Sequence, residues 1–384
     1  MIRGSSLGWA AGLVAATIVA TACSSTEEPS SPSTCGTAEL IVAASDYASS
    51  VVCGAPCCVK GPATSGVDLG RDPQLATSRG RVFFIARDSE LLFELDPRSG
   101  RVLGRTNLHE AAAPTGVNPQ DVAVAPDGSL WVALYSVPYV AIVRDGKIVE
   151  RIDISRFDGD GNPQAASIRI VDVNGAPKAF VTLQRLDLKD RSGVYSKQPS
   201  QMIRIDVATR VVEATTELAG RNPFSLLEEH DGALFIAAPG SFEKNDETTA
   251  GIERFETTTG ATRLVVSERA LGGSPTQVAI TDGCGAAIVA GPAPNVNPTA
   301  VVTFDPTTGA VSRPMSDAVL GPTPGYDLQG LAWRGNLLYV GDRRAGDRGY
   351  RVHVFERAPG TCNLQPVERA LDLPERPVAL RAAQ

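Results

Sequence analysis

The sequence is poor in the residues that metal and nucleic-acid sites most often use. Only three histidines occur in 384 residues, and His109, His230 and His353 are far apart in the chain. A multi-histidine metal centre would therefore require the fold to gather all three. The 36 Lys and Arg residues are outnumbered by 43 Asp and Glu residues, for a formal net charge of -7. Nucleic acid is not an expected partner, because phosphate binding needs clustered basic side chains.

Several motifs of known chemistry are also missing. The sequence contains no Gly-x-Ser-x-Gly elbow, phosphate loop, dinucleotide fingerprint or Cys-x-x-Cys-His haem motif. No sustained 3.6-residue period follows the first 23 residues, which excludes a helical solenoid. Glycine and proline are abundant, with 37 and 27 residues in a chain that is 43% hydrophobic. This composition predicts many short strands joined by turns.

The first 23 residues have the pattern of an export signal. Residues 1–3 carry a positive charge, and residues 8–22 form an apolar run that is too short to cross a hydrocarbon core of about 30 Å. Residues 19–23 read VATAC, which resembles the lipobox of bacterial lipoproteins, although Ala20 stands where leucine is usual. The resemblance implies cleavage after residue 22 and a lipid on Cys23. The alternative is an ordinary signal peptide followed by a chance cysteine.

The residues after Cys23 suit a membrane tether. Residues 24–33 are Ser, Thr, Glu and Pro, which cannot bury apolar surface. Ser24 is not the aspartate that retains lipoproteins in the inner membrane of enteric bacteria. We therefore predict a signal peptide at residues 1–22, a lipid-anchored tether at 23–38 and a folded domain at 39–384. The predicted location is the cell envelope, with the outer membrane favoured.

Six further cysteines remain, an even number for an oxidising compartment. They predict up to three disulfides, whose pairing the sequence does not determine because six cysteines allow 15 connectivities. The run from Cys53 to Cys58 also fits a metal or redox motif, but it lacks a second Cys or His pair at zinc spacing. The disulfide candidates are Cys35, Cys53, Cys57, Cys58, Cys284 and Cys362.

A repeated segment predicts the fold. Its units are an apolar strand, an acidic turn and often a second strand, which together form a β-hairpin. The copies are residues 91–100 (LLFELDPRSG), 203–209 (IRIDVAT), 252–260 (IERFETTTG), 301–309 (VVTFDPTTG) and 352–360 (VHVFERAPG), with a shortened copy at 140–146 (VAIVRDG).

Small apolar strands precede these hairpins. They begin at residues 73, 119, 163, 223, 275, 327 and 377, and their small residues suit the crowded centre of a β-propeller. Four strands in each 45–60 residues is a blade pattern, and seven such starts predict seven four-stranded blades in one all-β domain. The strand near residue 377 has no hairpin after it, and strands at 39–43 and 50–52 have no inner strand before them. We expect the two chain ends to complete one blade together; the alternative is a six-bladed ring with a frayed end.

The blades resemble those of the YVTN/NHL and gluconolactonase-like propeller superfamily. The resemblance is clearest at residues 127–132 (DGSLWV) and 305–309 (DPTTG), and it implies fold more than function. Hydrolytic members hold a divalent metal in the central channel through Glu, Asn and Asp side chains. Asn118, Asn222 and Asp342 are the counterparts that this chain offers, but Ala133 and Leu134 stand where the hydrolases place an aspartate. A lactonase-like hydrolase is therefore the alternative function.

Residues 157–163 (FDGDGNP) place oxygen-bearing side chains at alternate positions. Asp158, Asp160 and Asn162 could aim at one calcium ion, as the first positions of a calcium loop do. The remainder of an EF-hand is absent, so the alternative is a polar turn between blades. Calcium is the only cofactor that the sequence suggests.

Long charged insertions are expected between the second and third strands of three blades, and hence on one face. Such loops are common places for recognition. The candidate binding residues are Arg185, Asp187, Lys189, Tyr195, Phe242, Arg343 and Arg344. With no convergent acid and base residues, the leading hypothesis is a non-catalytic binding or scaffolding module for a protein, peptide or saccharide. A subunit that only braces an envelope complex is a further alternative.

Overall fold

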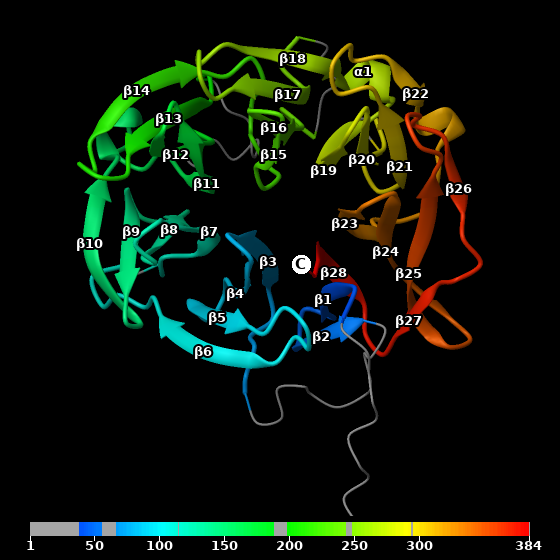
Figure 1. The fold of residues 1–384 in the computed structure, drawn as a ribbon, viewed down its shortest axis with the longest axis horizontal. Helices are drawn as coiled ribbons and strands as arrows, with labels where there is room; N and C mark the ends of the chain where they lie inside the picture. Colours follow the sequence, from blue (N-terminus) through cyan, green and yellow to red (C-terminus); the bar gives the residue numbers. More distant parts are fainter. Residues whose placement is uncertain are drawn as a thin grey trace, which may run out of the picture. The chain divides into compact units, whose positions relative to one another are not determined.

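The computed structural model describes residues 38–55, 67–113, 115–187, 198–242, 248–292 and 295–383. These residues form seven antiparallel sheets, arranged as blades around a central axis (Figure 1). The predicted single β-propeller with seven blades is confirmed, and the six-bladed alternative is wrong. Residues 1–37, which include the predicted signal peptide, Cys23 and nearly all of the predicted tether, lie outside the described residues.

Six blades follow one another along the chain, each with its innermost strand first. Blade 1 is β3 (Pro73–Ser78), β4 (Arg81–Ala86), β5 (Leu91–Leu95) and β6 (Val102–Asn107). Blade 2 is β7 (Pro119–Val124), β8 (Leu130–Leu134), β9 (Tyr139–Arg144) and β10 (Lys147–Asp153). Blade 3 is β11 (Ala165–Val173), β12 (Ala176–Leu183), β13 (Gln201–Asp206) and β14 (Val212–Glu217). Blade 4 is β15 (Glu228–His230), β16 (Ala233–Ala238), β17 (Gly251–Glu256) and β18 (Thr262–Ser267).

The next two blades differ at their outer edges. Blade 5 is β19 (Ser274–Thr281), β20 (Cys284–Ala290), β21 (Thr299–Phe304) and β22 (Val311–Arg313). Blade 6 is β23 (Leu328–Arg334), β24 (Leu337–Gly346) and β25 (Gly349–Arg357), whose outer edge pairs with two short strands, β26 (Leu364–Pro366) and β27 (Leu371–Leu373). Helix is limited in the described residues to one turn, α1 (Glu268–Leu271), and two 3-10 turns, Ser155–Phe157 and Met315–Asp317. None of the helices described has the length and apolar character that a membrane span requires.

The two ends of the chain complete blade 7. The C-terminal strand β28 (Pro377–Ala382) pairs with β1 (Leu40–Ser45), which pairs in turn with β2 (Ser50–Ala55). In the described residues this blade has three strands, with β28 innermost. The predicted closure is thus confirmed: β1 and β28 share one sheet, so the ring has no end blade with an unpacked face.

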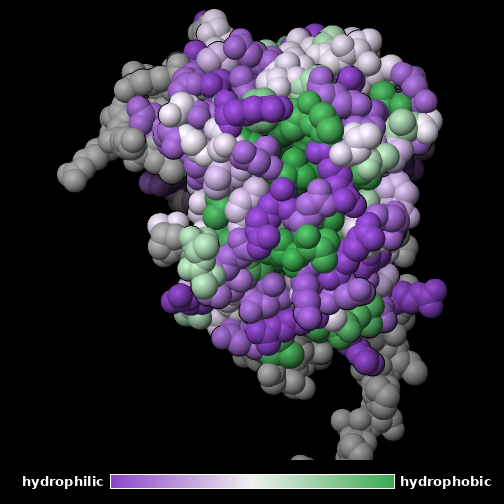
Figure 2. All heavy atoms as spheres, turned by 90° about the vertical axis from the view of Figure 1, so that its left-hand side faces the viewer, coloured by the Kyte–Doolittle hydropathy of each residue, from purple (hydrophilic) through white to green (hydrophobic). Residues whose placement is uncertain are grey.

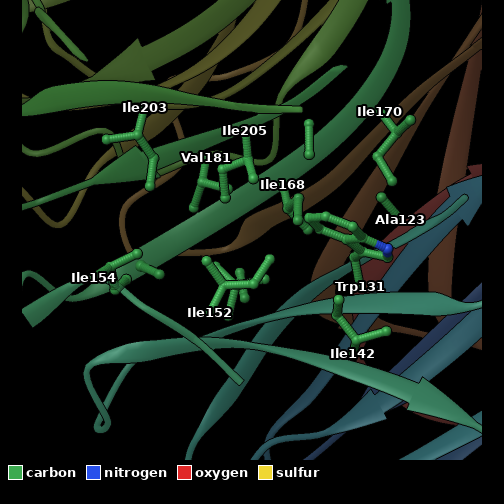
Figure 3. Packing of buried hydrophobic residues seen from close by; sticks show 14 of the residues in the cluster. Ala123, Trp131, Ile142, Ile152, Ile154, Ile168, Ile170, Val181, Ile203 and Ile205 are labelled. Atoms are coloured by element: carbon green, nitrogen blue, oxygen red, sulfur yellow. The ribbon is translucent and has the colours of Figure 1, made fainter. Parts of the chain in front are cut away.

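Neighbouring blades are held together by buried apolar clusters. Between blades 2 and 3, Trp131 of β8 packs among isoleucines that include Ile142 of β9 and Ile168 of β11 (Figure 3). Trp131 is 1% exposed, and burial of so large a ring is a main contribution to this contact. The outer side of the ring near β10 and β14 is mostly hydrophilic, with small apolar areas between (Figure 2).

The repeated acidic turn has two structural roles. In the copy at 305–309, the Asp305 carboxylate accepts hydrogen bonds from the backbone N–H groups of Thr307 and Thr308, which fixes the turn. Gly309 closes it with a φ of +78°, and a Cβ atom there would lie 1.9 Å from the Val265 carbonyl oxygen in β18 of the preceding blade. Gly100 makes the same approach to Cys53 and Gly54 of β2. In these two copies the turn therefore also docks the hairpin tip onto the preceding blade.

One disulfide joins two blades. Cys284 at the start of β20 is bonded to Cys362, which follows β25, so the bond links blade 5 to blade 6. Cys53 is disulfide-bonded as well. The other predicted candidates, Cys35, Cys57 and Cys58, lie outside the described residues.

Candidate functional site

A cavity of about 390 Å³ opens where the innermost strands begin, at one mouth of the central channel. All seven blades contribute to its lining, which is a mixture of amide, aromatic and aliphatic side chains. The volume falls in the range of small-molecule sites, roughly 300–1,000 Å³. The convergence of many blades on one concave, mostly uncharged surface makes this cavity the candidate functional site.

Three exposed aromatic rings line the cavity. Tyr47, Phe224 and Tyr326 are 50%, 46% and 41% exposed, and all three belong to the lining. The other strongly exposed large apolar side chains in the described residues are aliphatic and lie elsewhere: Val67, Leu103, Val149 and Val211. The exposed aromatic surface of the described chain is therefore concentrated at the cavity.

Tyr47 is held by blade 6. Its hydroxyl donates to Oε1 of Gln329 at 3.2 Å, and Nη1 of Arg343 donates to the same oxygen at 3.1 Å. The Arg343 guanidinium also lies 4.8 Å from the centre of the Tyr47 ring. These contacts fix the ring between β1 and β2 without burying it.

Phe224 reaches the cavity because the predicted inner strand at 223–226 is not a strand. Asn222 adopts a φ of +57°, and the backbone N–H groups of Phe224 and Ser225 both donate to the Ala237 carbonyl. The Ser225 hydroxyl accepts the Ala237 N–H at 2.9 Å, in place of a regular ladder bond. β15 begins only at Glu228, and the irregular segment turns Phe224 toward solvent, where its ring edge meets Phe242 at 5.8 Å between centroids.

Amide side chains supply most of the polar surface. On the wall formed by blades 1 and 2, Gln120 donates to Oδ1 of Asn118 at 2.6 Å and accepts from Arg87 at 3.2 Å. Arg87 also donates to Asp72 at 2.5 Å. The amides of the lining are Gln74, Asn118, Gln120, Gln184, Asn222, Gln277 and Gln329. Such groups can both donate and accept hydrogen bonds.

Charged side chains also meet in the central channel as one layer, and two of them, Glu228 and Arg381, line the cavity. Arg169 of β11 donates to the carbonyl oxygens of Thr77 in blade 1 and Leu227 in blade 4, at 2.8 and 3.0 Å. Glu228 lies 4.0 Å from Arg381 of β28. The Glu228 side chain keeps 28% of its surface accessible and belongs to the cavity lining. Burial raises its pKa, against the lowering effect of the Arg381 and Arg169 cations.

Asp121 is the second carboxyl of this layer. It accepts hydrogen bonds from the Ser167 hydroxyl and the Ile168 N–H at 2.5 and 2.9 Å, which tie blade 2 to blade 3. Burial nevertheless raises its pKa. Its hydrogen bonds give Asp121 a structural role between blades.

The three residues of the metal hypothesis are not brought together as one set. Asn118 and Asn222 line the cavity, each with a left-handed φ that asparagine tolerates well. Asp342 is not in the lining: it is bonded to Arg344 at 2.7 Å and to His353 at 2.9 Å. Although burial opposes it, these partners lower the pKa of Asp342. No three His, Cys, Asp or Glu side chains among the described residues gather as a metal group.

Residues 158–162 form a chain of turns. Oδ1 of Asp158 accepts the Asp160 N–H at 3.4 Å, and Oδ1 of Asp160 accepts the Asn162 N–H at 2.8 Å. The Asn162 amide donates to the Tyr135 carbonyl at 3.2 Å, between blades 2 and 3. The polar-turn alternative accounts for all of these bonds, while calcium binding stays a prediction.

The predicted binding residues are divided between three places. Arg343 and Phe242 contact the aromatic residues of the cavity, whereas Arg344 pairs with Asp342. Arg343 and Arg344 belong to β24, so the third predicted insertion is mainly an extended hairpin. Arg185 donates to the Pro199 carbonyl across the base of the blade 3 insertion. Asp187 lies at the start of this insertion and is among the described residues. Lys189 and Tyr195 lie outside the described residues.

The sequence analysis missed the aromatic residues of the cavity. Phe224 and Tyr326 each stand one residue from the predicted start of an inner strand, and Tyr47 lies between the two N-terminal strands. The starts of all inner strands meet at the same mouth of a propeller. Aromatic residues near these starts are therefore the sequence feature that could have predicted the cavity lining.

Comparison with known proteins supports the fold alone. No protein-family profile matches the sequence, and no curated protein matches it. A putative 6-phosphogluconolactonase from Bacteroides fragilis superposes with a TM-score of 0.53 at 15% identity, over 89% of this chain and 96% of that one. Virginiamycin B lyase from Staphylococcus aureus superposes with a TM-score of 0.51 at 12% identity, over 77% of this chain and 85% of that one. Hydrazine synthase from Kuenenia stuttgartiensis superposes with a TM-score of 0.50 at 17% identity, over 76% of this chain and 79% of that one. These identities are too low to transfer a function, so the chain is similar to these proteins as a β-propeller.

Proposed function

We propose that this protein is a non-catalytic binding propeller that takes its ligand at the mouth of the central channel. The observation that supports this most is the gathering of three exposed rings, Tyr47, Phe224 and Tyr326, in one amide-lined cavity. Exposed aromatic side chains on a rigid frame are typical of recognition surfaces, because they offer a large contact area at a small entropic cost.

The acids and arginines that line the cavity face one another. Asp72 pairs with Arg87 at 2.5 Å, and Glu228 faces Arg381 at 4.0 Å. A general acid or base needs a reacting proton within hydrogen-bond reach. Carboxylates that already pair with arginines are better suited to holding the channel in shape.

The proposal includes a cellular setting. Export, lipid attachment at Cys23 and a tether over residues 23–38 would hold the propeller at the envelope surface of a membrane, preferably the outer one. The propeller would then present its channel mouth to a protein, peptide or saccharide of that compartment. Mass spectrometry of the mature N-terminus tests this part: a diacylated Cys23 supports the setting, and an unmodified or uncleaved N-terminus contradicts it.

A metal-dependent hydrolase is the second candidate. It is favoured by one observation, that Asn118 and Asn222 both line the cavity. In such an enzyme the two amide oxygens would contribute to a cation site, and a metal ion would polarise the carbonyl of a lactone.

Ligand-observed NMR on the full-length chain separates the two candidates. The mixture should contain neutral sugars, acidic sugars, short peptides and simple lactones, with and without calcium. Binding without turnover, lost in Phe224→Ala and kept in Leu103→Ala, supports the binding propeller. Leu103 is 60% exposed on β6 and serves as the control outside the cavity. Consumption of a lactone that stops in Asn118→Ala or Asn222→Ala would overturn the proposal in favour of the hydrolase.

A further inference from the structure

From the chemistry of its lining we infer that the cavity binds a neutral saccharide, a deepening that rests on the proposed binding function. Three features of the lining lead to this ligand class: the rings, the amides and the balance of charge. A peptide, an acidic sugar and a phosphorylated ligand are the competing classes.

The exposed rings match the faces of a sugar. A pyranose has an apolar C–H face that can lie flat on an aromatic ring, which buries apolar area at little entropic cost. Tyr47 has one side occupied by the Arg343 guanidinium at 4.8 Å, and the ring remains 50% exposed. Phe224 and Tyr326 are 46% and 41% exposed, so each can cover part of a ligand.

The amides match the hydroxyl groups of a sugar. Each sugar hydroxyl can donate and accept, and an amide side chain offers both functions in one plane. Oε1 of Gln74 accepts a hydrogen bond from the Leu75 N–H at 2.9 Å, and Oε1 of Gln277 accepts one from the Gly330 N–H at 3.0 Å. Within the described part of the chain, no protein group accepts a hydrogen bond from Nε2 of Gln74 or Nε2 of Gln277, which leaves two donors on the cavity wall.

The charges of the lining disfavour an ionic ligand. The only charged residues of the described lining are Asp72, Arg87, Glu228 and Arg381, two acids and two bases. Each acid faces one of the arginines, at 2.5 and 4.0 Å. A phosphate or carboxylate would have to compete with these partners, whereas a neutral ligand leaves them in place.

Calorimetric titration of the full-length chain tests the inference. The probes are maltotriose, cellotriose and chitotriose as neutral saccharides, with glucose 6-phosphate, glucuronate and a neutral tripeptide as competitors. We expect at least one neutral trisaccharide to bind. Its affinity should fall about tenfold in Phe224→Ala and in Tyr47→Ala, and stay close to wild type in Tyr47→Phe.

The variants separate stacking from a structural effect. Tyr47→Phe removes the hydroxyl that donates to Gln329 but keeps the ring, so retained affinity assigns the binding energy to stacking. Leu103→Ala replaces an exposed side chain outside the cavity, on the outer strand β6, and serves as the control. This variant should bind the trisaccharide with wild-type affinity. Melting curves should show that each variant is folded.

The outcomes also separate the inference from the proposed function. If the tripeptide or a charged sugar binds at the rings and no neutral saccharide does, the saccharide inference is wrong and the binding propeller stands. If no probe binds in a manner that depends on Phe224 or Tyr47, the saccharide inference and the proposed binding function are both wrong.

Discussion

The guanidinium of Arg381, on the last strand of the chain, lies 4.0 Å from the carboxylate of Glu228 in blade 4. Blades 4 and 7 are not neighbours in the ring, so this pair spans the central channel, and both side chains line the cavity (Figure 1). The strand that closes the propeller thus also supplies one of the charges that define the floor of the candidate site.

The pair predicts a pH dependence of stability. Burial raises the pKa of Glu228 above its ordinary value of 4.5, so the folded state holds the proton more tightly than the unfolded state. The stability that Glu228 contributes is therefore present below pH 4.5 and is lost as the pH rises through the higher folded pKa. In urea unfolding, the stability of wild type relative to Glu228→Gln should decrease between pH 4 and pH 7. An increase over that range would mean that the Arg381 pair outweighs burial.

The hairpin tips predict a matched pair of glycine substitutions. Gly309→Ala would place a Cβ atom 1.9 Å from the Val265 carbonyl oxygen, in addition to the strain of a left-handed φ of +78°. Gly128 has a similar φ of +83°, and a Cβ atom added there would have no neighbouring atom within 4 Å. Gly128→Ala should cost about 1–2 kcal/mol, and Gly309→Ala should cost about 1–3 kcal/mol more. Equal losses in urea unfolding would show that the tip does not dock on the preceding blade.

The core between blades 2 and 3 predicts a large loss for one residue. Trp131→Ala should lower the free energy of unfolding by about 3–5 kcal/mol, because the ring is buried and leaves a cavity. Val149→Ala, on the outer strand β10 and 55% exposed, should change it by less than about 0.5 kcal/mol. Chemical denaturation of both variants checks the contrast, and a small loss for Trp131→Ala would contradict the packing in Figure 3.

The disulfide between blades 5 and 6 predicts a further stability difference. Its cysteines are 78 residues apart, so the bond constrains a long loop of the unfolded chain. The double variant Cys284→Ser with Cys362→Ser should be less stable by about 2–5 kcal/mol. The double variant is preferable to a reducing agent, because Cys53 is also disulfide-bonded and a reductant would act on both. An unchanged melting temperature would show that the bond does not stabilise the ring.

Much of the fold could be predicted from the sequence because its signals are local. The acidic turn at 305–309 carries its own hydrogen bonds, and its glycine has a φ that other residues avoid. The position of the inner strands follows from short apolar runs, and the unmatched strands at the two ends predicted the closed blade. The exception is blade 4, where the Ser225 hydroxyl takes over a ladder bond from the backbone and delays β15 to Glu228.

Less of the candidate site could be predicted, because it depends on contacts between distant segments. Tyr47 and Gln329 are 282 residues apart, and only the closed ring brings them within hydrogen-bond distance. Asp342 looked suitable for a metal from its place after a strand, but His353 and Arg344 engage its carboxylate. Arg344 lies two residues along the same strand, on the same face as Asp342. His353 comes from β25, so its contact with Asp342 depends on the pairing of the β24–β25 hairpin.

The most direct test of the binding account is to locate a bound ligand. A trisaccharide that carries a diazirine group should be photo-crosslinked to the full-length chain, and the labelled peptides should be identified by mass spectrometry. The account predicts labels within residues 222–228 and 326–331, and competition by the unmodified trisaccharide. Labels confined to the outer strands β6, β10 and β14, or labelling that excess trisaccharide does not reduce, would contradict a binding site at the mouth of the channel.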